Sequence, residues 1–549
     1  MQSKMRNPGI LLLVLFLSAY RFISAPVFAQ IDGNSQYTEK IVEKAGIVKI
    51  TLPAAFFKPD NEKKTWSSLV SPVGRVYDTL IDLKQVAIIM NRMGTIEARV
   101  RLQVPGANGL ILYFKNLILP DHASLYLYSP FKGSPKRIDR GLLPGGPVSL
   151  PMTEGNIVDL IWELPESQLN DLIADLSGVG VVLYPENTSI GGSGACEVNV
   201  NCEEGDAWKD QRDAVVRILV RNKQSVYWCT GVLVNNTARD KTPYILTANH
   251  CGKGATIENV AQWQFFFNFE AEGCANPIVE PEKKMTIGGR KKAASDAANG
   301  NLGSDFYLLT LLQGIPAGAR AYFSGWSRIN EAPVHGVCIH HPQGDLKKIS
   351  TYTTPAVSAN WESTPGTHWK VVWAATANGH GVTEGGSSGS PLFNSEGLLV
   401  GTLTGGQASC DSASLNQPDY FGKFSYHWDA NGQADTLRLS PFLDPLNTGA
   451  STLEGTPLTI DEKYNSFNPV QIVPNPVSSG FSLLGVSGNV GGIQPVYISV
   501  FDVSGRLVLQ GSLVNPISDI FRVDVLSPGL YLVKIELQRK IIFQKMVKE

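Results

Sequence analysis

Short apolar runs, many of them alternating with polar residues, recur along most of the chain and are separated by turns containing proline or glycine. In the first third of the chain they include VRLQV at 100–104, LILYF at 110–114 and SLYLY at 124–128. Such runs are typical of β-strands that bury at least one face. We therefore predict a β-rich module over residues 30–190. It contains no cysteine and few polar side chains at spacings that suggest chemistry, so a propeptide or accessory domain is favoured over a second enzyme.

The pattern of short strands and turns continues over residues 191–450. A stretch bearing Thr, Gly, Ser and Pro at 451–467 is predicted to be a linker. In the last segment, 468–549, the runs VYISVFDVSGRLV at 496–508 and LYLVKIEL at 530–537 predict hairpins of an Ig-like β-sandwich. The chain is therefore expected to be mostly β, with about three folded units for its length.

The first 29 residues have the features of a signal peptide. Lys4 and Arg6 precede the apolar run Ile10–Leu17, and the small-residue pattern Val27-Phe28-Ala29 resembles a cleavage site. The run is shorter than the roughly 20 apolar residues that span a bilayer, and no later stretch is long enough. We predict export, cleavage after Ala29 and no membrane span in the mature form.

Charge and cysteine content indicate which partners are unexpected and which part of the chain is held by disulfides. Lys and Arg total 47 against 49 Asp and Glu, which gives no reason to expect nucleic acid or an anionic membrane as a partner. Export permits disulfides, and every cysteine falls within the central segment. They are Cys196, Cys202, Cys229, Cys251, Cys274, Cys338 and Cys410. Their number predicts one disulfide-stapled domain but does not fix the pairing, because six cysteines allow 15 connectivities.

Three local sequences in that domain supply the parts that a hydroxyl needs to attack a peptide bond. YILTANHC at 244–251 ends a strand-like run at His250, and GSDFYLLTL at 303–311 places Asp305 before an apolar strand. EGGSSGSPLF at 384–393 surrounds Ser388 with glycines that allow a sharp turn and aim backbone amides at one point. We predict a triad with Ser388 as nucleophile, His250 as general base and Asp305 as the group that orients it. The amides of Gly386 and Ser388 are the predicted oxyanion hole.

The segment 191–450 resembles the bacterial lysyl endopeptidases, a branch of the chymotrypsin-like double β-barrel proteases. The motifs that carry this likeness are GGSGACEVNVNC at 191–202, WCTGVLVNNT at 228–237, TANHC, SDF, IHHP at 339–342, GVTEGGSSGSP at 381–391 and PDYFG at 418–422. The resemblance implies a secreted monomer that cleaves proteins or peptides after lysine without a cofactor. It also implies the bridges Cys196–Cys410, Cys202–Cys274 and Cys229–Cys251, with Cys338 left as a buried thiol.

The same resemblance implies that Asp419 lies at the base of the primary specificity pocket and that Trp361 forms a wall beside it. Well-known members stack an imidazole on that tryptophan, but the matching position here is Thr404. The backbone of Thr404 and Gly405 is expected to pair with substrate as an added strand. No metal site is predicted, because His340 and His341 have no zinc-type spacing.

Activation of such an enzyme is expected to differ from that of animal trypsins. There a newly freed N-terminus pairs with an aspartate just before the nucleophile, but here that neighbour is Ser387, so we expect no acceptor of that kind. The likeness places the mature start near Gly191. No Lys or Arg occurs between Arg140 and Lys209, which leaves two outcomes: a second protease makes the cut, or the enzyme cuts near Lys136 and keeps the segment beyond it attached. The first is favoured, because the Gly-rich joint around 187–194 is of the kind that proteases cut.

The last segment resembles the sorting domains that direct proteins through the type IX secretion system. The elements are PNP at 474–476, VFDVSGRLV at 500–508, LSPGLYLVKI at 526–535 and the basic end QKMVKE. This implies the secretion machinery as a partner and an extracellular or cell-surface location. Two other hypotheses stay open: a serine protease of glutamyl or broad specificity, and a non-catalytic surface adhesin built on a protease scaffold.

Overall fold

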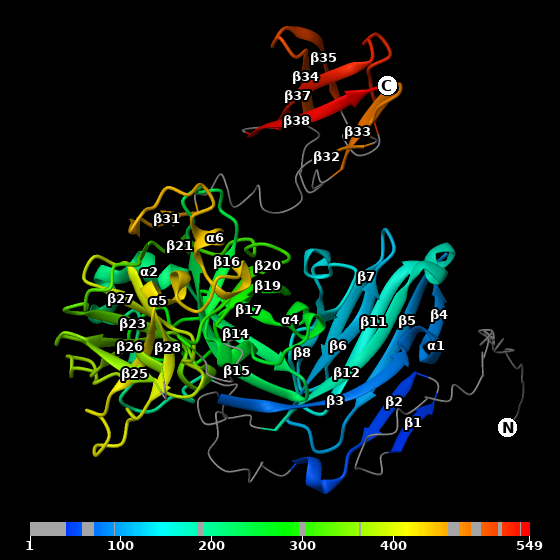
Figure 1. The fold of residues 1–549 in the computed structure, drawn as a ribbon. Helices are drawn as coiled ribbons and strands as arrows, with labels where there is room; N and C mark the ends of the chain where they lie inside the picture. Colours follow the sequence, from blue (N-terminus) through cyan, green and yellow to red (C-terminus); the bar gives the residue numbers. More distant parts are fainter. Residues whose placement is uncertain are drawn as a thin grey trace, which may run out of the picture. The chain divides into compact units, whose positions relative to one another are not determined.

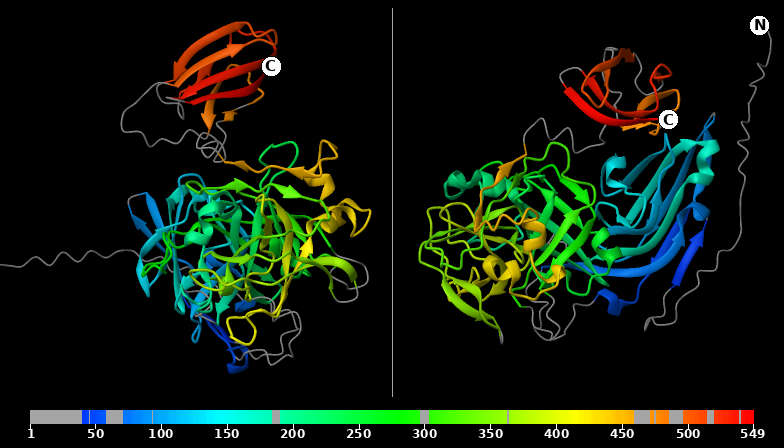
Figure 2. Two further views of the ribbon diagram at one scale, coloured as in Figure 1. Left: turned by 90° about the vertical axis from the view of Figure 1, so that its left-hand side faces the viewer. Right: turned by 45° about the horizontal axis from the view of Figure 1, so that its top comes forward.

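The computed structural model describes residues 40–44, 46–57, 71–92, 94–183, 190–295, 303–361, 364–458, 471–473, 475–484, 496–513, 519–537 and 540–549. The predicted signal peptide and most of the predicted linker lie outside the described residues. Figure 1 shows the elements, and Figure 2 gives two further views of them. Among the described residues, no helix combines the length and the apolar character needed to cross a bilayer.

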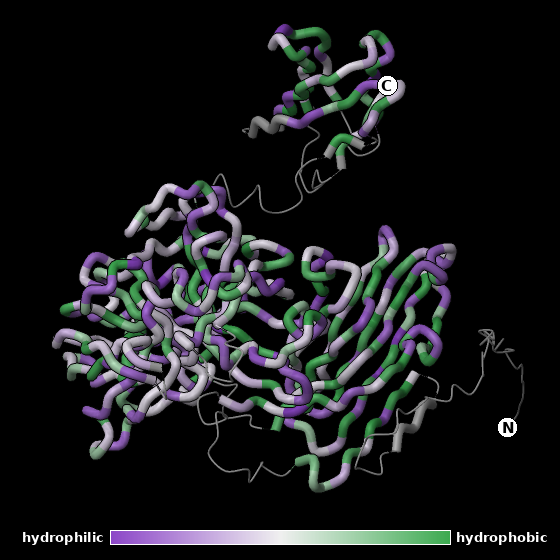
Figure 3. Tube along the Cα trace, viewed as in Figure 1, coloured by the Kyte–Doolittle hydropathy of each residue, from purple (hydrophilic) through white to green (hydrophobic). Residues whose placement is uncertain are grey.

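The N-terminal module is built from two sheets. Its strands are β1 (Lys40–Lys44), β2 (Ile47–Thr51), β3 (Ser71–Asp82), β4 (Ile88–Arg92), β5 (Thr95–Gln103), β6 (Gly109–Ile118), β7 (Ser124–Ser129), β8 (Lys132–Arg137), β9 (Val148–Ser149), β10 (Thr153–Glu154), β11 (Ile157–Pro165) and β12 (Ile173–Val182), with the short helix α1 (Leu83–Val86). In β5 alternate residues are buried, as the sequence pattern predicts. Figure 3 shows the resulting alternation of apolar and polar residues along these strands.

The central domain carries most of the remaining strands and helices. They are β13 (Val198–Asn199), β14 (Val215–Asn222), β15 (Ser225–Val234), β16 (Tyr244–Thr247), β17 (Gln264–Phe267), β18 (Lys284–Ile287), β19 (Gly289–Ala294), β20 (Tyr307–Leu311), β21 (Tyr322–Phe323), β22 (Trp326–Ser327), β23 (Gly336–His340), β24 (Lys348–Tyr352), β25 (Val357–Trp361), β26 (Thr364–Val371), β27 (Pro391–Asn394), β28 (Leu399–Gly406), β29 (Asp419–Lys423), β30 (Thr452–Leu453) and β31 (Thr456–Pro457). Its helices are α2 (Lys209–Ala214), α3 (Asn249–Gly252), α4 (Ile257–Ala261), α5 (Phe424–Asp429) and α6 (Ser440–Leu443).

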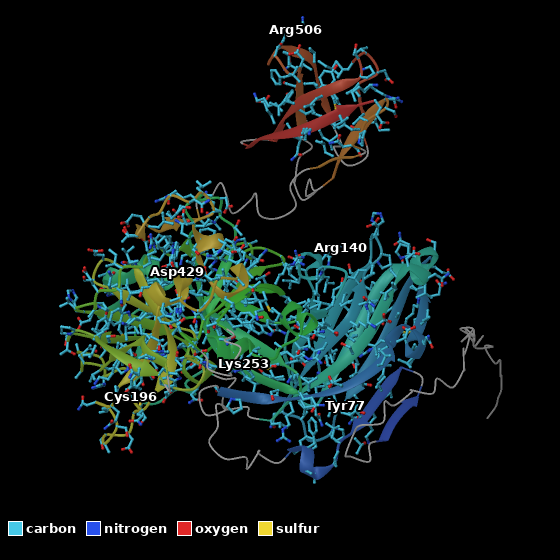
Figure 4. The ribbon with its side chains drawn as sticks, in the orientation of Figure 1. Tyr77, Arg140, Cys196, Lys253, Asp429 and Arg506 are labelled. Atoms are coloured by element: carbon cyan, nitrogen blue, oxygen red, sulfur yellow. A yellow bond between two sulfur atoms is a disulfide. The ribbon has the colours of Figure 1, made fainter. Side chains whose placement is uncertain are left out.

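Two barrel-like groups of strands divide the central domain. The first runs β16-β15-β14-β17-β18, with β20 pairing with β16 and β19 pairing with β20. The second runs β13-β24-β23-β27-β28-β29-β26-β25. Each group encloses its own apolar core, around Trp263 and Phe265 in the first and around Trp369 and Phe421 in the second. A third cluster, which includes Val232 and Phe393, packs the two groups together. Figure 4 draws the side chains of this domain, with Cys196 and Asp429 labelled.

Strand pairing also joins the N-terminal module to the first barrel. Strand β3 pairs antiparallel with the first part of β15, from Ser225 to Trp228. At this junction the Arg221 guanidinium lies 2.8 Å from the Asp78 carboxylate. The two modules therefore share one 12-stranded sheet.

The C-terminal module is a small sandwich of a three-stranded and a four-stranded sheet. Its strands are β32 (Gln471–Val473), β33 (Gly480–Leu484), β34 (Val496–Phe501), β35 (Leu507–Leu513), β36 (Phe521–Arg522), β37 (Gly529–Leu537) and β38 (Lys540–Lys548). Its core includes Ile498, Val533 and Phe481. The predicted fold class, a mostly β chain with a two-barrel domain and a terminal sandwich, is confirmed.

Candidate active site

Two hydrogen bonds hold His250 against Asp305. Strand β16 ends at Thr247, and α3 then turns the chain so that the His250 amide donates to Asp305 Oδ1 over 2.9 Å. The imidazole Nδ1 lies 2.7 Å from the other carboxylate oxygen, Oδ2. Asp305 is fully buried and has a φ of 60°, a left-handed conformation that is uncommon for a non-glycine residue. A hydrogen bond donated by Nδ1 to this carboxylate leaves Nε2 as the base.

The nucleophile turn depends on two glycines. Gly386 has φ 94° and Gly389 has φ 82°, values that side chains rarely adopt. A Cβ at Gly389 would also lie 2.1 Å from Thr247 Oγ1, at the end of the strand that leads to the histidine. The Ser388 carbonyl accepts from the Thr230 amide over 2.8 Å, and the Cys251 sulfur contacts it at 3.9 Å. The structure thus packs the Ser388 turn against the segment that carries His250.

A loop that begins within the IHHP motif contacts this turn. We call residues 341–345 the supporting loop. Thr230 Oγ1 accepts from the His341 amide over 3.1 Å and donates to the Gly386 carbonyl over 2.9 Å. The Gln343 amide donates to the Gly385 carbonyl over 2.6 Å. A Cβ on Gly386 would lie 2.9 Å from the Gly344 nitrogen, so the loop and the turn are in direct contact.

The adjacent histidines have separate structural partners. His340 Nδ1 lies 2.8 Å from the hydroxyl of Ser387, which precedes the nucleophile, and its Nε2 lies 3.0 Å from Ser350 Oγ. Burial lowers the pKa of His340 to about 3, so its imidazole is neutral at pH 7. His341 Nδ1 bonds the Asp345 carbonyl over 2.9 Å. Sequence reasoning considered these residues only as metal ligands and missed this contact with the nucleophile turn.

Asp419 begins β29 and is buried, with three hydrogen-bond donors around its carboxylate. Trp373 Nε1 and Thr383 Oγ1 each donate to Oδ2 over 2.7 Å, and the Ala408 amide donates to Oδ1 over 3.3 Å. Burial raises the pKa of Asp419 to about 6, although these donors oppose the shift. A Cβ on Gly406 would lie 2.0 Å from Oδ1, so glycine is needed at that position.

Trp361 and Thr404 are brought together by an imidazole that sequence reasoning missed. The ring of His368 stacks on Trp361, with centroids 5.5 Å apart, and its Nε2 lies 2.9 Å from Thr404 Oγ1. The expectation that Thr404 leaves the tryptophan without an imidazole is therefore wrong, because His368 reaches it from β26. The register of β28 against β29 shifts between Leu403 and Gly405, which places a bulge at Thr404.

Three disulfides staple this domain, and they are the pairs that the resemblance implies. They join Cys196 to Cys410, Cys202 to Cys274 and Cys229 to Cys251, while Cys338 is free and buried. Cys251 follows the histidine directly, so the third bond ties α3 to β15. Glu197, Glu384 and Cys410 come within metal-binding reach of one another, but the disulfide removes the thiolate that Cys410 would need to be a ligand.

The N-terminal edge of the domain bonds directly to the supporting loop. The Gly191 amide donates to Asp345 Oδ1 over 2.9 Å, and the Ser193 hydroxyl donates to Oδ2 over 2.6 Å. The residue just before the nucleophile, Ser387, carries no carboxylate, as the sequence indicates. The carboxylate that the backbone of Gly191 meets is Asp345, which lies on another loop than the nucleophile.

Comparison with known proteins gives two family matches on this chain. The model of the lysyl endopeptidase C-terminal domain matches residues 190–422, and that of the secretion system C-terminal sorting domain matches residues 471–549. Lysyl endopeptidase from Pseudomonas aeruginosa is 30% identical over 370 residues, which are 63% of this chain and 76% of that protein. Among solved structures, an HtrA-type protease with a tripeptide is similar over 40% of this chain and 60% of its own length, with a TM-score of 0.27 and 16% identity.

Proposed function

Because this chain belongs to the lysyl endopeptidase family, we propose that it hydrolyses peptide bonds on the carboxyl side of lysine, with His250, Asp305 and Ser388 as its catalytic triad. It is an exported protease, and its sorting domain makes the type IX secretion machinery a partner. Protein or peptide substrates follow from the protease activity. The domain boundaries at residues 29, 190 and 467, and a monomeric state, are part of the proposal. The expected boundary at 450 moves to at least Pro457, because β30 and β31 pair with β22 and β21 of the central domain.

The proposed reaction is acyl transfer to water. His250 Nε2 takes the proton of Ser388 Oγ as that oxygen attacks the substrate carbonyl carbon. The carbonyl oxygen gains the negative charge and is stabilised by the amides of Gly386 and Ser388. The histidine then gives its proton to the leaving amine, and water releases the acyl group by the same steps in reverse order. Asp305 stabilises the imidazolium through the 2.7 Å contact with Nδ1.

The observation that carries the proposal is the two-point contact between His250 and Asp305. A carboxylate that merely starts a strand has no reason to bond both the amide and the ring of one histidine. Within the described part of the chain, the buried Nε2 of that ring makes no hydrogen bond, which suits a base that awaits a substrate complex. The Ser388 turn is packed against the same segment.

The proposed specificity rests on Asp419, with Trp361, Thr404 and Gly405 as further substrate-binding residues. A lysine ammonium that enters an apolar pocket needs an opposing charge, and Asp419 supplies a buried carboxylate. A glutamate side chain would instead be repelled by it. The same charge therefore favours a basic residue over the glutamyl alternative.

Two measurements test the proposal. A serine-directed phosphonate should label Ser388 in a one-to-one ratio, whereas an adhesin on a protease scaffold should take no label. Cleavage-site profiling on a peptide library should show lysine before the cut bond, with arginine far behind. Labelled enzyme that cuts after glutamate or without preference would refute the lysine pocket and leave the triad standing.

A further inference from the structure

The first four residues of the predicted mature chain bond both the supporting loop and the start of the nucleophile turn. We call Gly191–Gly194 the N-terminal segment. The Gly191 amide and the Ser193 hydroxyl bond the carboxylate of Asp345, as described above, and the Ser193 amide also reaches Oδ2 at 3.2 Å. The Gly194 amide donates to Glu384 Oε2 over 3.1 Å. One segment thus holds a carboxylate on the supporting loop and another at the start of the nucleophile turn.

The disulfide fixes this segment in place. Cys196 is bonded to Cys410, its amide approaches the Cys410 sulfur at 3.3 Å, and its carbonyl accepts from the Gly381 amide over 3.0 Å. A Cβ added to Gly194 would lie 2.4 Å from the Cys410 sulfur, so the backbone approaches the bridge closely. The segment therefore cannot move far from the two carboxylates while the bridge is intact.

Asp345 connects this segment to the oxyanion hole through the supporting loop. Its amide donates to the Pro342 carbonyl, and its own carbonyl accepts from His341 Nδ1 over 2.9 Å. The Arg217 guanidinium donates to the Gly344 carbonyl over 2.6 Å and lies over the rings of Trp228, Phe266 and Phe269. A shift of Asp345 would therefore be passed to Gly344, which touches Gly386.

The hydrogen bonds that the Asp345 carboxylate accepts in the uncut chain come from neutral donors, the Gly191 and Leu346 amides at Oδ1 and the Ser193 amide and hydroxyl at Oδ2. The side chain of Asp345 is fully buried, and the Lys348 ammonium is 3.7 Å from Oδ2, beyond hydrogen-bond distance. Lys348 bonds Asn199 Oδ1 instead, over 2.8 Å. The donor at hydrogen-bond distance from Oδ1 in the N-terminal segment is the neutral Gly191 amide. A positive charge at that nitrogen would make a stronger, charge-assisted bond.

We propose that Asp345 is the acceptor for the mature N-terminus and thereby a positioning residue for the oxyanion hole. Hydrolysis of the bond between Ile190 and Gly191, by an endopeptidase that accepts an aliphatic residue, adds water to give a carboxylate on Ile190 and an ammonium on Gly191. The ammonium replaces the amide that already faces Asp345. The ion pair then holds the supporting loop against Gly386. This inference rests on the proposed function, because it concerns the same oxyanion hole.

A chain with a defined cleavage site tests the proposal. Residues 185–190 are replaced by Glu-Asn-Leu-Tyr-Phe-Gln in the full-length protein, so that a cysteine protease specific for that sequence cuts directly before Gly191. A second chain carries one extra serine before Gly191 and is cut in the same way. Both release the N-terminal module, but the second places its ammonium one residue too far along.

The proposal predicts which of these forms becomes active. Cutting before Gly191 should raise kcat for a lysyl amide substrate at least tenfold, with KM within a factor of two, because the oxyanion hole acts on the transition state. The chain with the extra serine should keep less than a tenth of that gain. Asp345→Asn in the first chain should give a kcat that does not respond to the cut, while Asp435→Asn, at an exposed carboxylate, should respond as the parent does.

The possible outcomes test the role of Asp345 and the proposed protease function separately. Equal kcat for the two cut chains, or a full response of Asp345→Asn to the cut, would overturn the role of Asp345. If Asp345→Asn does not fold, as judged by thermal melting, the chain with the extra serine decides alone, because it keeps Asp345. A parent chain that takes no phosphonate label after the cut would instead overturn the proposed function.

Discussion

Replacement of Asp419 by asparagine should show how much of the lysine specificity depends on the charge of this side chain and how much on its shape. The introduced amide side chain keeps the volume and can still accept from Trp373 and Thr383, but it offers no charge to a substrate ammonium. Removing one partner of a buried, hydrogen-bonded charge pair costs about 2–5 kcal/mol. At about 1.4 kcal/mol for each factor of ten, kcat/KM for lysine should fall by roughly 30-fold to several thousand-fold.

The assay compares two peptides that differ only in the residue before the cut bond, lysine in one and norleucine in the other. Norleucine fills the same pocket without a charge, so its kcat/KM should change by less than about threefold in Asp419→Asn. Asp411→Asn, at an exposed carboxylate beyond β28, is the matched control and should leave both values unchanged. An equal fall for the two peptides would mean that Asp419 only shapes the pocket, and an unchanged lysine preference would assign the charge to another carboxylate, such as Glu384.

Three further predictions follow from the same site. Ser388→Ala should lower kcat by about a millionfold while leaving the melting temperature almost unchanged; a variant with a tenth of the wild-type rate would refute the assignment of the nucleophile. Gly406→Ala should lower kcat/KM for lysine more than tenfold, because its Cβ would lie 2.0 Å from Asp419 Oδ1; unchanged kinetics would show that the pocket can rearrange. The raised pKa of Asp419, about 6 against 3.8, means that the unfolded chain loses this proton first, so the free energy of unfolding should fall by about 2 kcal/mol as the pH rises from 4 to 6. Urea titrations should show this fall in the wild type and not in Asp419→Asn.

The triad residues could be proposed from sequence because each lies in a local sequence that its chemistry requires. The glycines around Ser388 adopt the positive φ values that a sharp turn needs. Those requirements involve only a few consecutive residues, so they can be recognised as a sequence motif. The residues that donate hydrogen bonds to Asp419 do not form a sequence motif with it. Trp373 and Thr383 lie 46 and 36 residues before it, and the pairing of β26 with β29, which sets Val371 opposite Asp419, brings Trp373 near.

The imidazole that stacks on Trp361 shows why matching single sequence positions to those of a family can miss a contact. Sequence reasoning looked for the ring at Thr404 and concluded that it was absent. In the structure His368 lies opposite Ala359 in the β25–β26 hairpin and reaches Trp361 from there, while Thr404 accepts or donates at its far nitrogen. The imidazole that stacks on Trp361 thus comes from His368, which bonds Thr404, and not from position 404 itself. Burial lowers the pKa of His368 to about 4, so this ring is neutral at pH 7.

The acceptor for the N-terminus illustrates why some requirements are tied to chain position and others are not. A nucleophile must lie on a particular backbone turn, so its neighbours in sequence are constrained. A carboxylate that meets an ammonium must only reach one point in space, and any loop passing that point can carry it. Ser387, where sequence reasoning looked for the carboxylate, bonds His340 instead, and Asp345 supplies the charge from the supporting loop. Both arrangements put a buried carboxylate in contact with the structures that hold the oxyanion hole. A search for activation switches in related sequences should therefore examine every loop that touches the nucleophile turn, and not only the residue before the serine.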